Sequence, residues 1–190
     1  YAREVVSRFL TRAYRRPAAP DEIDTLMRFY DRIRPDFSSL ETAMREVLSM
    51  ALVSPEFLYL IEPGEEEKRP LDDYEVASRL SYFLWNTMPD KALSAAAARG
   101  KLTKTRALRR QVKRLLEDPR SQQFIDSFTH QWLDLGSVDR VAVNPEYYED
   151  FNESIKSSMQ EETRSFFAEI LRKDLSALHL LDSDFLFLNE

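Results

Sequence analysis

The sequence predicts an all-α protein, with a small three-helix unit followed by a larger helical bundle of about five helices. Glycine occurs only 3 times in 190 residues, and a chain so poor in glycine has few hairpins and tight turns. Apolar side chains recur at helical spacing along most of the chain. With 43% hydrophobic residues, the chain can fill one sizeable core or two small ones.

The first predicted unit covers residues 1–61. Its helices are expected over residues 3–15, 21–34 and 38–52, and a short turn follows from Ser54-Pro55. Residues 62–70 are charged and contain proline and glycine, so they are interpreted as a linker.

The second predicted unit covers residues 71–190. An aspartate, Asp72 or Asp73, caps its first helix, which ends near Trp85. Further helices are expected over residues 89–100, from Thr103, over 121–135 and over 147–173. Residues 180–190 are expected to be a short helix or extended.

Composition excludes several functions. The chain has no cysteine, which rules out disulfides, zinc–thiolate sites and a CxxCH haem attachment within it. Its net charge of -6 argues against a nucleic-acid partner. No apolar run approaches the ~20 residues that span a bilayer, and no signal peptide is visible. Because the chain begins at Tyr1 and its end carries no stop signal, we expect an excised piece of a longer protein.

Residues 79–90 (RLSYFLWNTMPD) concentrate aromatic bulk. On a helix the apolar side chains here cover about half of the cylinder, wider than a surface helix needs. Core packing is the favoured interpretation. The alternative is an aromatic ligand pocket built from Tyr82 and Trp85, with Trp132 from a later helix.

Glu162 falls at the edge of the apolar stripe of the last long helix. A carboxylate buried there needs a cation or hydrogen-bond donors. Arg79 is the predicted partner, in a buried structural ion pair. A catalytic acid or base and a position at the wet margin of the helix are the alternatives.

The helix that begins near Thr103 is strongly basic. Arg106, Arg109, Arg110 and Lys113 project away from its apolar stripe. A solvated face or an intramolecular partner is favoured. The alternative is a basic docking face for phosphate or an acidic glycan. The intramolecular partner would be the acidic long helix of this chain itself.

Two histidines and an acidic tail complete the candidates. His130 lies between Asp126 and Asp134 at helical spacing, which suits a weak metal site, although a solvated polar face is simpler. His179 is interpreted as a packed or capping residue. Asp182, Asp184, Asn189 and Glu190 supply oxygen ligands but lack EF-hand spacing, so a capped turn is favoured over calcium. No catalytic, cofactor-binding or metal-binding residue is assigned.

Seven stretches carry a family resemblance: Leu52-Val-Ser-Pro-Glu-Phe-Leu58, Asp73-Tyr-Glu-Val-Ala-Ser-Arg-Leu-Ser-Tyr-Phe-Leu-Trp85, Met88-Pro-Asp90, Asp118-Pro-Arg-Ser121, Phe128-Thr-His-Gln-Trp-Leu133, Met159-Gln-Glu-Glu-Thr-Arg-Ser-Phe-Phe167 and Leu181-Asp-Ser-Asp-Phe-Leu-Phe-Leu-Asn-Glu190. In order and spacing they resemble two neighbouring domain families of unknown function, numbered 1595 (residues 1–60) and 1592 (residues 70–190). The resemblance implies a large, exported, planctomycete-type parent protein in the periplasm or on the cell surface. It also implies that a c-type haem domain can lie elsewhere in the parent, and that this chain is truncated at its C-terminus. The haem motif is absent here, and no cofactor is assigned to this chain.

Three hypotheses for function remain open at this point. The first is an interaction or scaffold module that holds neighbouring domains of the parent, a c-type cytochrome domain among them. The second is a part of an oxidoreductase whose site is completed by other regions, with Tyr82, Trp85, His130 and Trp132 as pocket or relay residues. The third is glycan recognition, with Trp85, Trp132, Tyr147 and Tyr148 as stacking platforms.

Overall fold

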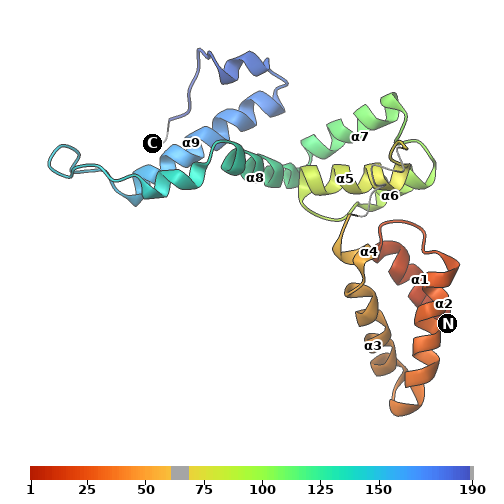
Figure 1. The fold of residues 1–190 in the computed structure, drawn as a ribbon. Coiled ribbons are helices and arrows are strands. Elements are labelled where there is room, and N and C mark those ends of the chain that lie inside the picture. The colour runs from red at the N-terminus through yellow and green to blue at the C-terminus, as the bar shows by residue number, and fades with distance from the viewer. Residues whose placement is uncertain (61–68, 189–190) are drawn as a thin grey trace. The chain divides into compact units, whose positions relative to one another are not determined.

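The computed structural model describes residues 1–60 and 69–188, and within these ranges all regular structure is helical (Figure 1). The all-α prediction is therefore confirmed. The chain divides into two compact units. Unit 1 comprises residues 1–82 and 87–111, and unit 2 comprises residues 83–86 and 112–190. The helices α5 (Asp73–Trp85) and α7 (Thr105–Glu117) each contribute to both units.

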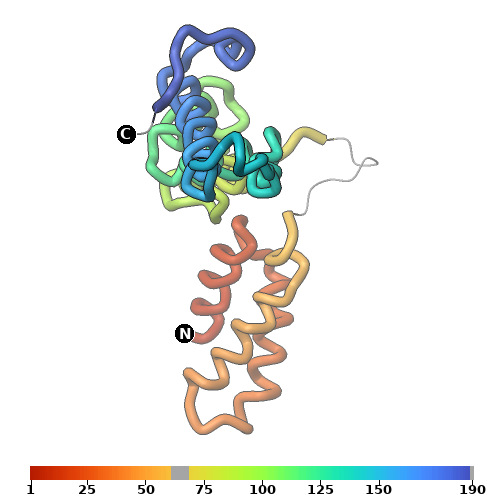
Figure 2. Tube along the Cα trace, turned by 90° about the vertical axis from the view of Figure 1, so that its left-hand side faces the viewer, coloured from red at the N-terminus to blue at the C-terminus, as the bar shows by residue number. Residues whose placement is uncertain are grey.

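Unit 1 begins with three helices that pack side by side (Figure 2). They are α1 (Ala2–Ala13), α2 (Pro20–Ile33) and α3 (Leu40–Leu52), followed by the short α4 (Pro55–Leu58). A 3-10 turn, η1 (Arg34–Asp36), follows α2 and contains Pro35. The core is formed by Val6, Leu10, Leu26, Met44, Val47 and Ala51. The predicted three-helix unit is thus present, because apolar stripes at helical spacing meet in one core.

The rest of unit 1 consists of α5 up to Tyr82, α6 (Lys91–Ala98) and the start of α7. Asp90 caps α6 by accepting the Leu93 N–H at 2.8 Å. Gly100 follows α6 with φ +62°, a left-handed conformation that favours glycine, as the sequence predicts for a helix end. The Asp73 carboxylate accepts backbone N–H groups of Leu102 and Thr103, which ties the loop before α7 to the start of α5.

Unit 2 is built around α8 (Gln122–Trp132) and the long helix α9 (Glu153–Arg172), which pack together (Figure 1). Short 3-10 turns precede and follow α8, namely η3 (Pro119–Ser121) and η4 (Leu135–Arg140). A last turn, η5 (Ala177–Leu180), leads into a segment whose Phe185 packs on Phe166 of α9, with ring centroids 5.0 Å apart.

Two helices of unit 2 are shorter than predicted. The predicted helix over 121–135 ends at Trp132, because Asp134 takes a left-handed conformation with φ 47°. The predicted helix from Tyr147 begins only at Glu153. Asn152 caps it, with its side-chain oxygen accepting the N–H groups of Ser154 and Ile155. The apolar pattern extends beyond each end, but the local capping geometry decides where the helix stops.

The predicted linker over 62–70 lies mostly outside the described residues, which resume at Arg69. The division into residues 1–61 and 71–190 therefore stays a prediction about folding units. Among the helices of the described ranges, none is both long enough and apolar enough to cross a membrane.

Candidate functional site

Trp85, at the end of α5, is buried in unit 2 with 2% of its surface exposed. Its indole Nε1–H donates to the backbone carbonyl of Leu115 at 2.8 Å. The guanidinium carbon of Arg120 lies 3.4 Å from the indole ring centroid, and that of Arg114 lies 5.4 Å from it. Cations over an indole face are stabilised by the ring quadrupole. Trp85 therefore packs in the core and has no face left for a ligand.

Arg120 is held over this ring by Asp118. The Arg120 Nε and Nη2 groups donate to the two Asp118 carboxylate oxygens, each at 2.8 Å, and the Arg120 backbone N–H donates to the same carboxylate at 3.0 Å. These hydrogen bonds lower the pKa of Asp118 to about 2. The carboxylate thus acts both as the cap of η3 and as the clamp of the cation on Trp85.

The low pKa of Asp118 predicts an acid-sensitive contribution to stability. Because its pKa is about 2 in the folded protein against an ordinary 3.8, the contribution is complete above about pH 4 and is lost as the pH falls to about 2. Solvent screening limits it to about 1 kcal/mol. Asp118→Asn keeps a capping oxygen but removes the titration, so it should flatten this part of the stability–pH curve in urea unfolding between pH 5 and pH 2. An unchanged slope in the variant would refute the assignment.

An aromatic strip runs along unit 2, formed by Phe83, Phe124, Phe128, Trp132 and Phe167. Successive ring centroids lie 4.8 Å (Phe83–Phe124), 5.3 Å (Phe124–Phe128) and 5.4 Å (Phe128–Trp132) apart, and Phe167 of α9 lies 5.4 Å from Phe128. The two ends of the strip are open, since Phe83 is 62% exposed and Trp132 is 53% exposed. Contacting rings with exposed faces form a surface able to bury a partner's apolar groups.

The three residues of the predicted aromatic pocket differ in their surroundings, and the pocket itself stays a prediction. Trp85 is in the core of unit 2, Trp132 is exposed on the aromatic strip, and Tyr82 belongs to unit 1. There the Arg15 guanidinium carbon lies 5.8 Å from the Tyr82 ring centroid. Of the glycan platforms, Trp85 is excluded by burial, whereas Tyr147 and Tyr148 are 79% and 63% exposed.

The basic face of α7 is solvent-exposed at every predicted position: Arg106, Arg109, Arg110 and Lys113. The Lys113 ammonium lies 3.7 Å from the Glu117 carboxylate one turn later, an exposed pair that contributes little to stability. The inward Leu115 is completely buried. The amphipathic pattern is therefore present as predicted, and its use in docking stays a prediction.

Unit 1 contains a cavity of about 340 Å³ that sequence reasoning missed. One wall comes from the end of α1 and the residues after it, and includes Tyr14, Arg15 and Arg16. Another comes from α4 and the residues after it, and a third from the start of α5 with the residues that precede it. We call this cavity the unit 1 pocket.

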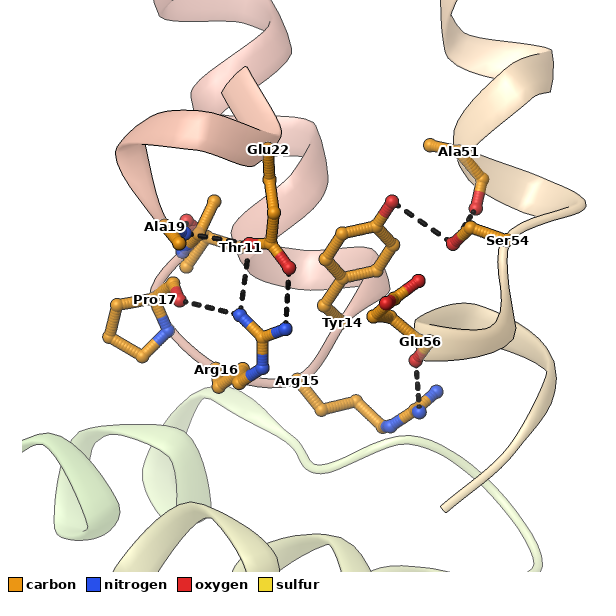
Figure 3. A network of polar contacts seen from close by, with 11 residues as sticks. Thr11, Tyr14, Arg15, Arg16, Pro17, Ala19, Glu22, Ala51, Ser54 and Glu56 are labelled. Atoms are coloured by element: carbon orange, nitrogen blue, oxygen red, sulfur yellow. Dashed lines mark hydrogen bonds and ion pairs between the residues drawn. The ribbon is translucent and has the colours of Figure 1, made fainter. Parts of the chain in front are cut away.

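Arg16, a lining residue of this pocket, binds Glu22 in the first turn of α2 (Figure 3). Its two terminal nitrogens donate to both carboxylate oxygens of Glu22, at 3.0 and 2.6 Å, and Nη1 also donates to the carbonyl of Pro17 at 3.1 Å. Glu22 in turn accepts the backbone N–H of Ala19 at 2.7 Å. The Arg16 hydrogen bond is the main reason why the pKa of Glu22 is lowered.

A second arginine–glutamate pair of the same kind lies at the start of α5, on another wall of the pocket. Arg69 donates to both carboxylate oxygens of Glu75 at 2.8 and 2.7 Å, and to the carbonyl of Pro70 at 3.1 Å. Glu75 accepts the backbone N–H of Asp72 at 2.7 Å, and Arg69 lowers its pKa. In both copies an arginine precedes a proline and the glutamate follows six residues after the arginine. This spacing, visible in the sequence, is the signal that could have revealed the pair.

Arg15 connects α1 to α4 in the same region (Figure 3). Its guanidinium donates to the backbone carbonyls of Glu56 at 2.7 Å, Tyr59 at 2.8 Å and Phe57 at 3.1 Å. These are carbonyls at the end of α4, which the helix itself leaves without partners. Arg15 has φ 61°, a conformation rarely adopted by residues other than glycine, asparagine and aspartate. The hydrogen bonds from Arg15 to the α4 carbonyls offset the cost of this strained conformation.

Contrary to the prediction from their spacing, Asp126, His130 and Asp134 do not share one helix face. Asp134 lies beyond the end of α8, and Asp126 accepts a hydrogen bond from Gln122 at 2.8 Å. The exposed His130 imidazole lies against Gly136, where an added Cβ would be 3.3 Å from Cε1. Within residues 1–60 and 69–188, no group of three or more acidic, histidine or cysteine residues is arranged to hold a metal ion.

The remaining candidates have ordinary surroundings. His179 packs against Phe185, with ring centroids 5.7 Å apart, as predicted for a packed residue. Glu162 and Arg79 are both exposed rather than buried, because each sits on the solvent side of its helix, and they belong to different units. Their pairing stays a prediction. Of the acidic tail, Asn189 and Glu190 lie outside the described residues.

Comparison with known proteins identifies two families along the chain. Residues 71–190 match the family described as PSD4, protein of unknown function (DUF1592), and residues 1–62 match the one described as PSD5, protein of unknown function (DUF1595). The resemblance inferred from the sequence motifs is thereby confirmed. No curated protein and no solved structure matches the chain.

Proposed function

This chain belongs to the DUF1592 family, and we propose that it acts as a helical interaction module that holds a neighbouring domain of its parent protein. The partner proposed is a c-type haem domain of the same parent, located in the periplasm or on the cell surface. Both the partner and the location rest on the family resemblance seen in the sequence. This chain itself supplies the docking surface.

The observation that carries the proposal is the open aromatic strip of unit 2. Phe83 and Trp132 remain 62% and 53% exposed although each contacts another ring of the strip. Burying a large apolar side chain contributes about 1.5–3 kcal/mol. Tryptophan is also among the residues that most often dominate the binding energy of an interface. An exposed tryptophan at the end of a row of contacting rings is therefore suited to anchor a partner.

The basic face of α7 gives the proposal a second, electrostatic component. Its four cationic side chains, Arg106, Arg109, Arg110 and Lys113, are exposed and can steer an acidic partner surface toward the module. Such steering weakens as ionic strength rises, whereas burial of the aromatic strip does not. The two components can therefore be separated by salt.

The test is a calorimetric titration of the chain with the separately produced haem domain of its parent, at low and moderate salt. We expect binding that weakens with salt. Trp132→Ala should reduce the affinity by about tenfold or more. Leu181→Ala is the matched control, since Leu181 is an apolar side chain of the same unit, 87% exposed and outside the strip, and should change the affinity less than about twofold.

Charge variants complete the test. Replacing Arg109 and Arg110 together with glutamine should reduce the salt dependence while leaving the high-salt affinity nearly unchanged. Absence of binding at any salt would remove the haem domain as the partner. Equal losses from Trp132→Ala and Leu181→Ala would show that the aromatic strip is not the docking surface.

Glycan recognition is the second candidate, favoured by the exposure of Tyr147, Tyr148 and Trp132. Flat exposed rings provide stacking surfaces for sugars, but Trp85 no longer belongs to this set because it is buried. A panel of acidic polysaccharides tested by the same calorimetry distinguishes the two. Binding abolished by Tyr147→Ala and Tyr148→Ala would favour the glycan. A role in an oxidoreductase site stays a prediction.

A further inference from the structure

The unit 1 pocket has the size and the wall chemistry of a small-molecule site. Its volume of about 340 Å³ falls at the lower end of the range, about 300–1,000 Å³, that is usual for ligand pockets. Three tyrosines, Tyr14, Tyr59 and Tyr74, are among its lining residues. Arginine, glutamate and aspartate side chains line it as well. Aromatic walls with a few polar groups are typical of sites that hold a planar organic molecule.

The charges on the walls are not equivalent. Arg16 is neutralised by Glu22 and Arg69 by Glu75, each through two hydrogen bonds to the carboxylate. Asp72 accepts the N–H groups of Tyr74 and Glu75, each at 2.8 Å, so the N-terminus of α5 compensates its charge. These groups define the shape of the pocket while their charges are already balanced.

Arg15 differs from the other two arginines. Its hydrogen bonds go to neutral backbone carbonyls, and among the described residues no carboxylate lies within ion-pair distance of it. A partly buried cation without a carboxylate favours a negatively charged ligand. The two terminal nitrogens of Arg15 already donate to four carbonyls, so an anion would meet the remaining Nε–H, which has no hydrogen-bond partner within residues 1–60 and 69–188. Since α4 holds the guanidinium in place, little side-chain entropy is lost when it binds an anion.

The nearby carboxylates limit the charge of that ligand. Glu56 and Asp72 both line the pocket, and the Glu56 charge acts on Arg16. A dianion such as a phosphate monoester would be repelled by the Glu56 carboxylate, whereas a single negative charge can face Arg15 alone. Tyr59 lines the pocket and is 66% exposed, so its ring is accessible for stacking with the ring of a ligand.

We propose that the unit 1 pocket binds a small organic carboxylate carried on a planar ring, with the carboxylate facing Arg15 and the ring among the tyrosines. The site is separate from the aromatic strip of unit 2 and does not depend on the docking function.

Three probes of closely related shape test the proposal on the full chain: benzoate, benzyl alcohol and acetate. Binding is followed by amide chemical shifts in nuclear magnetic resonance. Benzoate should bind at least about tenfold more tightly than benzyl alcohol, which has the ring without the charge, and than acetate, which has the charge without the ring. Equal affinity for benzoate and either of the other probes would overturn the proposal.

Variants locate the site. Tyr59→Ala removes an exposed ring and should weaken benzoate about fivefold without affecting the fold. Arg15→Gln should abolish the preference for benzoate over benzyl alcohol, and Arg8→Gln is the matched control on the exposed side of α1. If Arg15→Gln fails to fold, Tyr59→Ala still tests whether benzoate binds at the unit 1 pocket. Unchanged benzoate affinity in that variant, or shifts confined to unit 2, would refute the assignment.

Discussion

Replacing Trp85 by alanine is expected to lower the free energy of unfolding of unit 2 by about 3–5 kcal/mol, the range for removal of a buried aromatic side chain. The indole is 2% exposed, so its removal leaves a cavity. The carbonyl of Leu115 also loses its 2.8 Å hydrogen bond, and Arg120 loses the ring that it covers. Urea unfolding followed by far-UV circular dichroism measures the change.

Trp132→Ala is the control for this experiment, because it removes the same side chain from a position that is 53% exposed. It should cost less than about 1 kcal/mol. Trp85→Phe should fall between the two, since it keeps most of the volume but cannot donate to Leu115. If Trp85→Ala and Trp132→Ala were equally mild, the burial of Trp85 would not matter for stability.

Fluorescence provides an independent readout of the same arrangement. In Trp132→Phe the remaining emission comes from Trp85 and should be resistant to iodide quenching. In Trp85→Phe it comes from Trp132 and should be readily quenched. Equal quenching in both variants would contradict the two environments.

Replacing Arg15 by alanine is expected to destabilise unit 1 by about 2 kcal/mol, because hydrogen bonds from a charged donor contribute about 1.5–3 kcal/mol. The carbonyls of Glu56, Phe57 and Tyr59 lose this donor, and α4 loses its attachment to α1. Arg15→Gly removes the same contacts but relieves the strain of φ 61°. The glycine variant should therefore be more stable than the alanine variant by about 1 kcal/mol.

Thermal unfolding of the two variants beside Arg8→Ala measures this difference. Arg8 lies on the same helix with its side chain 80% exposed, so its removal should change the stability by less than about 0.5 kcal/mol. An alanine variant as stable as the glycine variant would show that the left-handed conformation of residue 15 is not maintained. A wild-type stability in both would remove Arg15 as the attachment of α4.

Much of the fold was predictable because its signals are local. Pro20 at the first turn of α2, Asp90 before α6 and Gly100 after it each act through a few neighbouring residues. The early end of α8 was not predictable in this way. The apolar pattern continues past Trp132, and a left-handed Asp134 is one of several conformations open to that residue.

The candidate sites also differ in how far the sequence predicts them. The exposed basic face of α7 follows from helical spacing alone, and the pairs Arg16–Glu22 and Arg69–Glu75 are visible as a repeated spacing. That both pairs line one pocket was not predictable, because Arg16 and Arg69 are far apart in the chain.

The sequence by itself therefore determined the helical class, most helix boundaries and the family, since periodicity, caps and motif order are properties of neighbouring residues. Only the tertiary structure decided that Trp85 is buried while Trp132 is exposed, and that Arg15 reaches the end of α4. The reason is physical. Burial and long-range hydrogen bonds depend on which segments meet in space, and both tryptophans lie on apolar helix faces in the chain.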